Sequence, residues 1–214
     1  MVGGPALVET IPADWRYYPP GPLPLILDAA LDCFVEQGYH GTSIRVIAGR
    51  AGLSVPGLYH HFASKQALLV AIVSYAMADL WDRSVAALEE AGNDVMHRLD
   101  LLVECLVLFH AHRRDLAFIA ASEIRSLAGQ ARVDYIAARD RQQRLMDHVV
   151  EEGVTSGRFA TPLAREASRA VITMCTGVAQ WYRQGGPLPP DELARDYCTI
   201  ARMAVGCDVP EVAS

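Results

Sequence analysis

A short stretch in the first third of the chain carries side chains that could contact a nucleic acid. The residues on the outer side of a short predicted helix there are Val55, Gly57, Tyr59 and His60, because Leu58 takes the inner side. A phenol and an imidazole can bond to phosphate or sugar oxygens, and a valine methyl can contact a thymine methyl. A helix of this size fits the major groove of DNA. The alternative is that Tyr59 packs inside the protein.

Side chains suited to catalysis or metal binding are present without the spacing that such sites need. His110 and His112 are two residues apart, so their rings diverge on a helix. We find no metalloprotease, nucleophile-elbow, Walker or dinucleotide-binding motif. The five cysteines form no C-x-x-C pair, which favours reduced thiols in the cytosol. The sequence therefore predicts a protein that is not an enzyme and holds no metal or cofactor.

The outer residues of the short helix, about Val55–His61, need a base that presents them. A helix is predicted at about Ser43–Ala51, and the turn Gly52–Leu53 joins the two. Gly52 can adopt the positive φ that such a tight turn requires. A further helix precedes them at about Leu23–Gln37, where Gly38 is expected to stop it. Three helices joined in this way have the geometry of a helix-turn-helix unit.

The composition is that of a globular protein. The 214 residues are 51% hydrophobic and 21% charged, and the net charge is −6. No run of eighteen apolar residues is present, which excludes a transmembrane protein, and the start of the chain does not resemble a secretory leader. We therefore expect a cytoplasmic protein with no membrane partner. The net negative charge argues against binding of nucleic acid over the whole surface of the protein. It is compatible with a local DNA-binding surface.

Apolar residues recur at spacings of three and four after residue 20, which predicts an all-α fold. Half of the twelve prolines lie in residues 1–24 and exclude a helix at the very start. We predict an extended arm (1–20), a three-helix helix-turn-helix DNA-binding domain (21–66) and a larger helical ligand-binding and dimerisation domain (67–214). The helices expected in the larger domain run from after Ser64 to about Glu89, and at about Asp94–His112, Leu116–Leu127, Arg132–Gly153, Leu163–Arg183 and Asp191–Val205.

The segment Ile26–Leu69 resembles the TetR-type bacterial transcriptional regulators. The matching positions are Phe34, Gly38, Tyr39, Thr42, Ile47, Ala48, Gly52, Leu53, Ser54, Leu58, Tyr59, His60, His61, Phe62, Lys65 and Leu68. The rest of the chain has the helix number of this family and no family-wide motif. The resemblance implies a homodimer that binds a palindromic double-stranded DNA operator and usually represses transcription. A small molecule bound in the C-terminal domain would release the DNA.

The resemblance also assigns DNA contacts to particular side chains. Arg45 would reach a base edge or a phosphate. The residues expected to line the base-reading edge are Ser54, Val55 and Gly57, and those expected to touch phosphate or sugar are Thr42, Tyr59, His60 and Lys65. His61 points in a different direction from its neighbour His60, so we expect His61 to be buried packing.

The charge of this segment departs from the family pattern. Residues 21–66 are neutral, because three cations (Arg45, Arg50, Lys65) face three acids (Asp28, Asp32, Glu36). Family members usually carry basic residues at the start of the first helix, where this chain has prolines. Since salt-dependent affinity grows with the phosphates neutralised, we expect weaker and less salt-dependent DNA binding, unless Arg16 lies near the DNA backbone. The alternative function is a helical ligand-binding dimer whose DNA binding is weakened or lost.

The larger domain is expected to hold a small, largely apolar effector between its helices. The candidates to line its cavity are Phe109, Phe118, Glu123, Gln143, Met146, Met174 and Trp181. The segment Trp181–Leu188 is similar to a subgroup of these regulators that controls fatty-acid or steroid breakdown and senses acyl-CoA thioesters. The phosphates of such a ligand would need cations. Those available are Arg125, Arg132, Arg139, Arg141 and Arg144, with a solvated helix face as the alternative.

Two apolar stripes near the C-terminus are candidates for a dimer contact. They fall in the predicted helices near 163–184 and 191–205, and their members are Ala167, Ala170, Val171, Met174, Val178 and Trp181, then Leu193, Tyr197, Ile200 and Ala204. Two such helices suit a four-helix contact between identical subunits, which would also space two recognition helices for a palindrome. The alternative is that both stripes belong to the core of one subunit.

Overall fold

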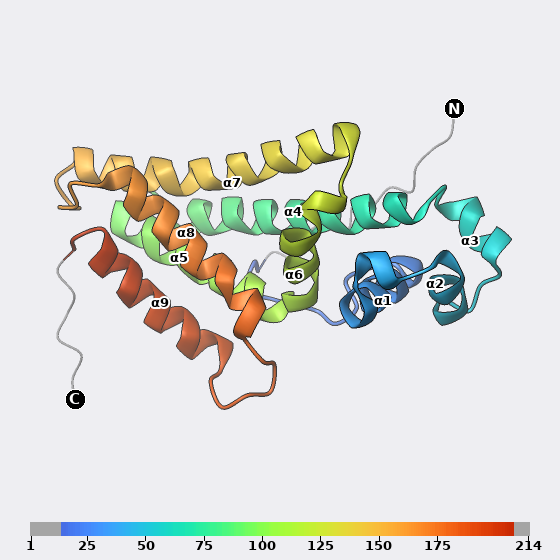
Figure 1. The fold of residues 1–214 in the computed structure, drawn as a ribbon. Helices are drawn as coiled ribbons and strands as arrows, with labels where there is room; N and C mark the ends of the chain where they lie inside the picture. Colours follow the sequence, from blue (N-terminus) through green and yellow to red (C-terminus); the bar gives the residue numbers. More distant parts are fainter. Residues whose placement is uncertain (1–13, 208–214) are drawn as a thin grey trace.

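The computed structural model describes residues 14–207. Within these residues all regular secondary structure is helical, and loops connect the helices (Figure 1). The helices are α1 (Leu25–Gly41), α2 (Ile44–Arg50), α3 (Val55–His61), α4 (Lys65–Ala91), α5 (Val95–His112), α6 (Arg114–Ser122), the 3₁₀ turn η1 (Glu123–Ser126), α7 (Gly129–Thr155), α8 (Ala164–Trp181) and α9 (Pro190–Ala204). The all-α class is confirmed. Within the described residues, none of these helices combines the length and apolarity that crossing a bilayer requires.

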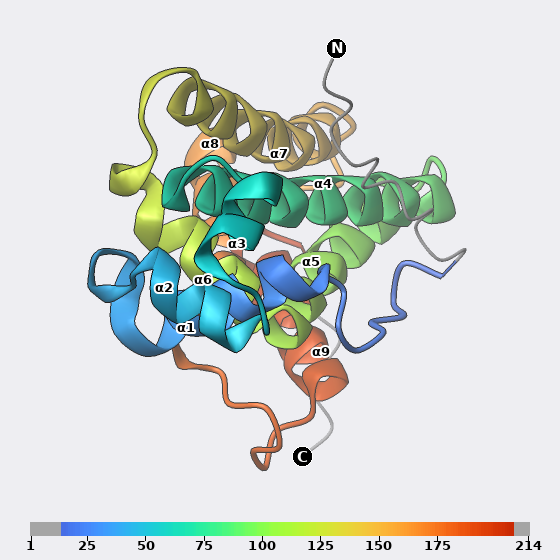
Figure 2. The same cartoon turned by 90° about the vertical axis from the view of Figure 1, so that its right-hand side faces the viewer.

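Helices α1, α2 and α3 form a small head at one end of the molecule (Figures 1 and 2). Phe34, Ile47 and Leu58 are buried at its centre, one from each helix. The head differs from expectation at Gly38, which was predicted to end the first helix. Gly38 adopts a φ of 72° and kinks the chain, and helical structure then continues to Gly41. A glycine tolerates this conformation without the steric cost that a side chain would add.

The body of the molecule is built around α5. Its buried residues include Leu102, Leu106 and Phe109, and it packs against α4, α7, α8 and α9. Helix α4 runs from the head along the body, and α6 contacts both α1 and α4 (Figure 1). The single helix expected at about Leu116–Leu127 is instead α6 followed by η1. The tighter 3₁₀ turn is a common way for an α-helix to end.

Residues 14–20, which we call the N-terminal strap, lie against the body. Trp15 is buried and its indole N–H donates to Glu90 at 2.6 Å. The buried guanidinium of Arg83 donates to the carbonyl oxygens of Trp15 and Tyr17, at 2.6 and 2.9 Å. The ring of Tyr18 stacks on His112 at 4.6 Å between centroids. Trp15 and Tyr18 thus dock the strap on the body through their rings, whereas Tyr17 is 57% exposed and is held by its carbonyl oxygen.

The strap also settles the position of Arg16. Its guanidinium pairs with Glu90 on α4 and with Glu104 on α5, at 2.9 and 2.6 Å. Both acids belong to the body. Arg16 therefore does not supply the missing positive charge to the head.

Candidate DNA-binding surface and ligand cavity

Helix α3 is presented outward by its cap and by one buried residue. The hydroxyl oxygen of Ser54 accepts from the backbone N–H of Gly57 at 3.1 Å, which fixes the first turn. Leu58 is fully buried, whereas the side chain of Tyr59 is 50% exposed and His60 is exposed. The expected outward orientation of this helix is present in the structure.

His61 is also exposed, and the expectation that it is buried was wrong. The reason is the small contact area of α3, which packs chiefly against α2 through the side that carries Leu58. The remaining sides of a two-turn helix with one such neighbour stay open to solvent.

Two arginines of α2 have different surroundings. Arg45 is exposed and has no ion pair or hydrogen bond within residues 14–207. Arg50 instead binds Glu36 through two hydrogen bonds and lies 3.9 Å from Asp32. The Arg45 guanidinium is therefore available to a ligand, while the positive charge of Arg50 is offset by acids of α1.

Thr42 and Lys65 form a structural contact between the head and α4. Thr42 is only 2% exposed, and its hydroxyl faces the carbonyl oxygens of Cys33 and Gly38 at 2.9 and 2.8 Å. This hydroxyl is enclosed by the end of α1, and the phosphate contact expected of Thr42 stays a prediction. The Lys65 ammonium donates to the carbonyl oxygens of Tyr39 and Thr42 at 2.6 and 2.7 Å. An ammonium has three N–H groups, so one remains for another acceptor.

A second contact joins the head to η1. The Ser126 hydroxyl donates to a Glu123 carboxylate oxygen at 2.7 Å, and the Nε2 atom of His40 lies 3.2 Å from the same hydroxyl oxygen. Since the only hydroxyl proton goes to Glu123, His40 must be the donor to Ser126. The end of α1 is thus tied to the body by both α4 and η1.

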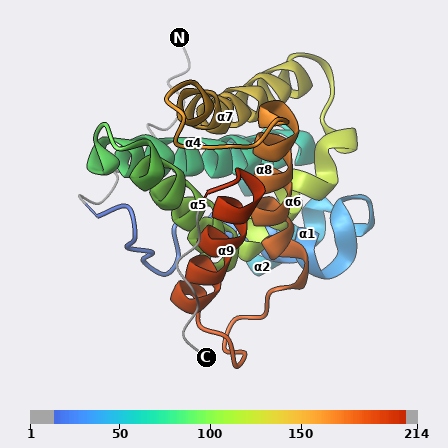
Figure 3. The same ribbon diagram turned by 90° about the vertical axis from the view of Figure 1, so that its left-hand side faces the viewer.

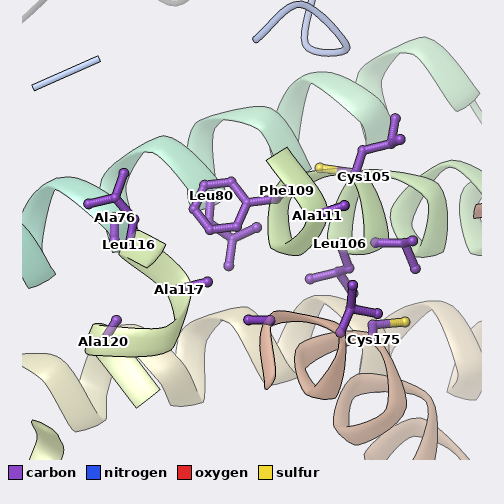
Figure 4. Close-up of a cluster of buried hydrophobic side chains, with 14 of the residues drawn as sticks. Ala76, Leu80, Cys105, Leu106, Phe109, Ala111, Leu116, Ala117, Ala120 and Cys175 are labelled. Carbon is purple, nitrogen blue, oxygen red and sulfur yellow. The ribbon is translucent and has the colours of Figure 1, made fainter. Parts of the chain in front are cut away.

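The body contains a cavity of about 460 Å³ between α4, α5, α6, α7 and α8. Its apolar lining includes Ala76, Leu80, Phe109, Ala117 and Ala120, which belong to the cluster of buried side chains shown in Figure 4. Three of these five residues are alanines. Their side chains end at Cβ and so leave space between the helices. The volume falls in the range of small-molecule sites.

Polar groups line the same cavity. Arg139 and Asp140 on α7 and Arg169 on α8 are part of the lining, and all three residues are exposed. Gln142 and His110 are buried members of the lining. Of the arginines considered for a CoA ligand, Arg139 lines the cavity; Arg169 was missed, because nothing in its local sequence distinguishes it from a surface arginine. The lining thus combines apolar side chains with polar ones and with charges of both signs, from Arg139, Arg169 and Asp140.

Two of the seven expected effector residues, Phe109 and Gln143, line this cavity. The other five lie outside its lining, and their part in effector binding stays a prediction. Met146 is fully buried in the core and Glu123 belongs to the contact with His40. Phe118, Met174 and Trp181 are outside the lining, and Trp181 is 51% exposed. Helical periodicity identified inward faces without showing which of them border the empty space.

A metal site or a reactive thiol would place specific requirements on the described residues. No group of three His, Cys, Asp or Glu side chains within residues 14–207 is arranged to hold a metal ion. Burial raises the pKa of the Cys105 and Cys198 thiols to about 12. These thiols remain protonated near neutral pH and are poor nucleophiles.

Helices α8 and α9 lie side by side on one face of the body (Figure 3). Their apolar stripes are divided between two roles. The members buried in the core of this chain are Ala167, Val171, Val178 and Leu193. By contrast, Trp181 and Ile200 are 51% and 47% exposed, and Met203 on α9 is 59% exposed. These three side chains, called the apolar strip below, are the candidates that α8 and α9 offer for an interaction surface.

The helix order, the exposed α3 and the internal cavity agree with the families that the chain matches. Residues 26–72 match the family described as "Bacterial regulatory proteins, tetR family", and residues 92–205, just over half of the chain, match the "Tetracyclin repressor-like, C-terminal domain". The chain belongs to the TetR family. It is a helix-turn-helix transcriptional regulator of the ligand-responsive repressor type.

Individual TetR regulators are similar over most of the chain. The transcriptional repressor KstR2 of Mycobacterium tuberculosis H37Rv is 30% identical over 82% of this chain and 88% of its own. The structure of PfmR from Thermus thermophilus has a TM-score of 0.75 and 32% identity, covering 86% of this chain and 99% of PfmR. The structure of AibR with isovaleryl coenzyme A and operator DNA has a TM-score of 0.75 and 22% identity, covering 86% and 97% of the two chains.

Proposed function

We propose that this TetR regulator binds a palindromic operator as a homodimer and represses transcription until a small ligand enters the cavity. The observation that carries the proposal is the exposed α3 beside the unpaired Arg45. Ser54, Val55 and Gly57 form the base-reading edge, while Tyr59 and His60 bond to the DNA backbone. Lys65 contacts a phosphate through its third N–H.

The two parts of the fold have separate roles in this proposal. Residues 21–66 bind DNA, and residues 67–214 bind the ligand and form the dimer. The apolar strip of Trp181, Ile200 and Met203 supports a contact through α8 and α9, since a second copy would remove it from water. The protein acts in the cytoplasm by binding and carries out no catalysis.

An acyl-CoA thioester is the effector class that the cavity favours. The apolar interior suits an acyl chain, and Arg139 and Arg169 at the opening suit the phosphates of CoA. The similar regulator AibR has a structure with isovaleryl coenzyme A, which supports this chemical class.

Helix α4 connects the ligand to the DNA-binding head. Its residues Ala76, Met77 and Leu80 line the cavity, and its first residue, Lys65, holds the end of α1. A ligand that displaces α4 therefore changes the position of α1 and, through α1, of α3. Release requires that the ligand bind more tightly to the displaced arrangement than to the DNA-bound one.

Fluorescence anisotropy with labelled DNA from the region flanking the gene tests the proposal. We expect the wild-type protein to bind this DNA and octanoyl-CoA to release it. Arg45→Ala should weaken binding about tenfold, within the range for one lost base or phosphate contact. Arg158→Ala, which removes an exposed arginine after the end of α7, is the matched control and should bind as the wild type does.

A second function is a ligand-binding dimer whose DNA binding is weakened or lost. The zero net charge of residues 21–66 is the reason to retain it. The pairing of Arg50 with Glu36 favours it, because that pairing removes a cation from the DNA-facing charge. Ligand binding in calorimetry, together with equal and weak anisotropy for specific and unrelated DNA, would establish this alternative and overturn the repressor proposal.

A further inference from the structure

A second, smaller cavity of about 190 Å³ lies between α4 and α7, which run side by side along the body (Figure 1). Its lining is largely apolar and consists, in that part, of Val70, Val73, Met77, Ala78, Leu127, Ala131, Tyr135 and Ala138. Val73 and Leu127 are buried, whereas the polar members Ser74, Asp134 and Arg141 are exposed. The function proposed above gives this space no role.

Two residues, Met77 on α4 and Tyr135 on α7, line both this cavity and the larger effector cavity. The α7 residues that line only the smaller cavity recur at spacings of three and four and so share one stripe of the helix: Ala131, Asp134, Ala138 and Arg141. The α7 residues that line only the larger cavity include Arg139, Gln142 and Gln143, on the adjacent stripe. Tyr135 therefore lies where the two stripes meet, between one cavity and the other.

The ring of Tyr135 extends from α7 to α6. Its hydroxyl donates to the Ala120 carbonyl oxygen at 2.5 Å, and Ala120 lines the larger cavity. Tyr135 is only 6% exposed, so this bond and its own helix hold the buried ring at both ends. Met77 is half-buried and unbranched, a side chain that adapts its shape to its surroundings. The two residues form a partition, one part of which is fixed and the other flexible.

We propose that the partition of Tyr135 and Met77 sets the length of acyl chain that the regulator accepts. The inference rests on the proposed function, because it concerns the acyl-CoA effector of the same cavity. A chain that fills the larger cavity ends against the partition, so further methylene groups gain no apolar surroundings. Without the partition, the end of a longer chain enters the smaller cavity beside Val73 and Leu127. Each methylene group buried in this way raises the affinity about fourfold.

Isothermal titration calorimetry on the full chain tests this proposal with saturated acyl-CoA thioesters of even length, from octanoyl-CoA to hexadecanoyl-CoA, each kept below its micelle concentration. The measured quantity is the affinity for hexadecanoyl-CoA divided by that for octanoyl-CoA. We expect Met77→Ala and Tyr135→Ala each to raise this ratio about tenfold or more over the wild type, since several more methylene groups become buried. Ile136→Ala truncates an exposed neighbour of Tyr135 that lines neither cavity and should keep the wild-type ratio.

Filling the smaller cavity distinguishes a longer site from a loosened fold. Ala138 is half-buried and lines only the smaller cavity, so Ala138→Leu occupies that space. Added to Met77→Ala, this substitution should return the ratio to the wild-type value. A general loosening of the contact between α4 and α7 would not be reversed by a larger side chain in the smaller cavity.

The outcomes separate this inference from the function on which it rests. If the wild type and both partition variants have the same ratio while all bind octanoyl-CoA, the chain-length role is overturned and the acyl-CoA function stands. A raised ratio that persists in the double variant also overturns the role. If no thioester binds the wild type, the acyl-CoA function fails and the chain-length role fails with it. Met77 is partly exposed, so Met77→Ala provides the test even if Tyr135→Ala does not fold.

Discussion

The guanidinium of Arg50 binds both carboxylate oxygens of Glu36, at distances of 2.8 and 2.6 Å, and so joins α2 to α1. Both side chains are exposed in part, so the pair contributes little to stability. The main effect of the pair is electrostatic. Glu36 offsets the charge of Arg50, one of the two arginines of the head, and so lowers the positive charge available to DNA.

Replacing this acid should strengthen DNA binding. We expect Glu36→Gln to raise operator affinity at low salt and to steepen the slope of log K against log[salt] by about one. Fluorescence anisotropy over a series of salt concentrations measures both quantities. Glu89→Gln removes the same charge near the far end of α4 and should leave the slope unchanged. An unaltered slope in Glu36→Gln would show that Arg50 remains away from the DNA.

The dimer contact should depend on the outward strip of α8 and α9. Ile200→Glu places a carboxylate where we propose that a second copy packs, so we expect a monomer and weaker operator binding. Light scattering on a sizing column measures the mass. Val133→Glu changes an exposed apolar residue of α7 and should remain dimeric. A dimer in both variants would move the interface away from this strip.

Gly153 should not tolerate a side chain. A Cβ atom there would lie 2.1 to 2.5 Å from ring atoms of Phe159, which is itself buried. We expect Gly153→Ala to lower the free energy of unfolding by about 2 kcal/mol, measured by urea unfolding. Gly49→Ala in α2 meets nothing within 4 Å and should stabilise the protein by up to about 1 kcal/mol. Equal stability of the two variants would contradict the close contact between Gly153 and Phe159.

Stability should fall in mild acid because of His110. Burial lowers the pKa of this imidazole from its ordinary 6.5 to about 4. Between these values the unfolded chain binds a proton that the folded chain does not, so stability present above pH 6.5 is lost as the pH falls towards 4. We expect the wild-type protein to lose about 2 kcal/mol more than His110→Gln between about pH 7.5 and pH 5. Urea unfolding at both pH values decides this, and equal losses would argue against a neutral, buried His110.

Local sequence was sufficient for the elements of the head. The bounds of α3 were predicted correctly because Ser54 caps it and Pro56 suits its first turn. The outward position of Tyr59 followed from the inward position of Leu58. By contrast, the burial of Thr42 depends on the kink at Gly38, which folds the chain back over that hydroxyl, and no local spacing reveals such a contact.

The cavity was harder to predict than the helices. Periodicity showed that Phe109 and Met146 face inward, yet only Phe109 borders the space. The difference depends on small residues of other helices, such as Ala117, whose Cβ atoms leave room beside one side chain and not beside the other. Which neighbours bond to the buried polar atoms of Gln142 and His110 is likewise visible only in three dimensions.

The placement of Lys65 has a practical consequence for handling the protein. It is the only lysine of the chain, and its ammonium holds two carbonyl oxygens at the end of α1. Acylating dyes, aldehyde fixation and coupling to succinimide-activated chips all consume side-chain amines. The α-amine of the chain reacts with the same reagents, so the molecules affected are those in which Lys65 itself is modified: they lose its hydrogen bonds to the end of α1 and should no longer recognise the operator.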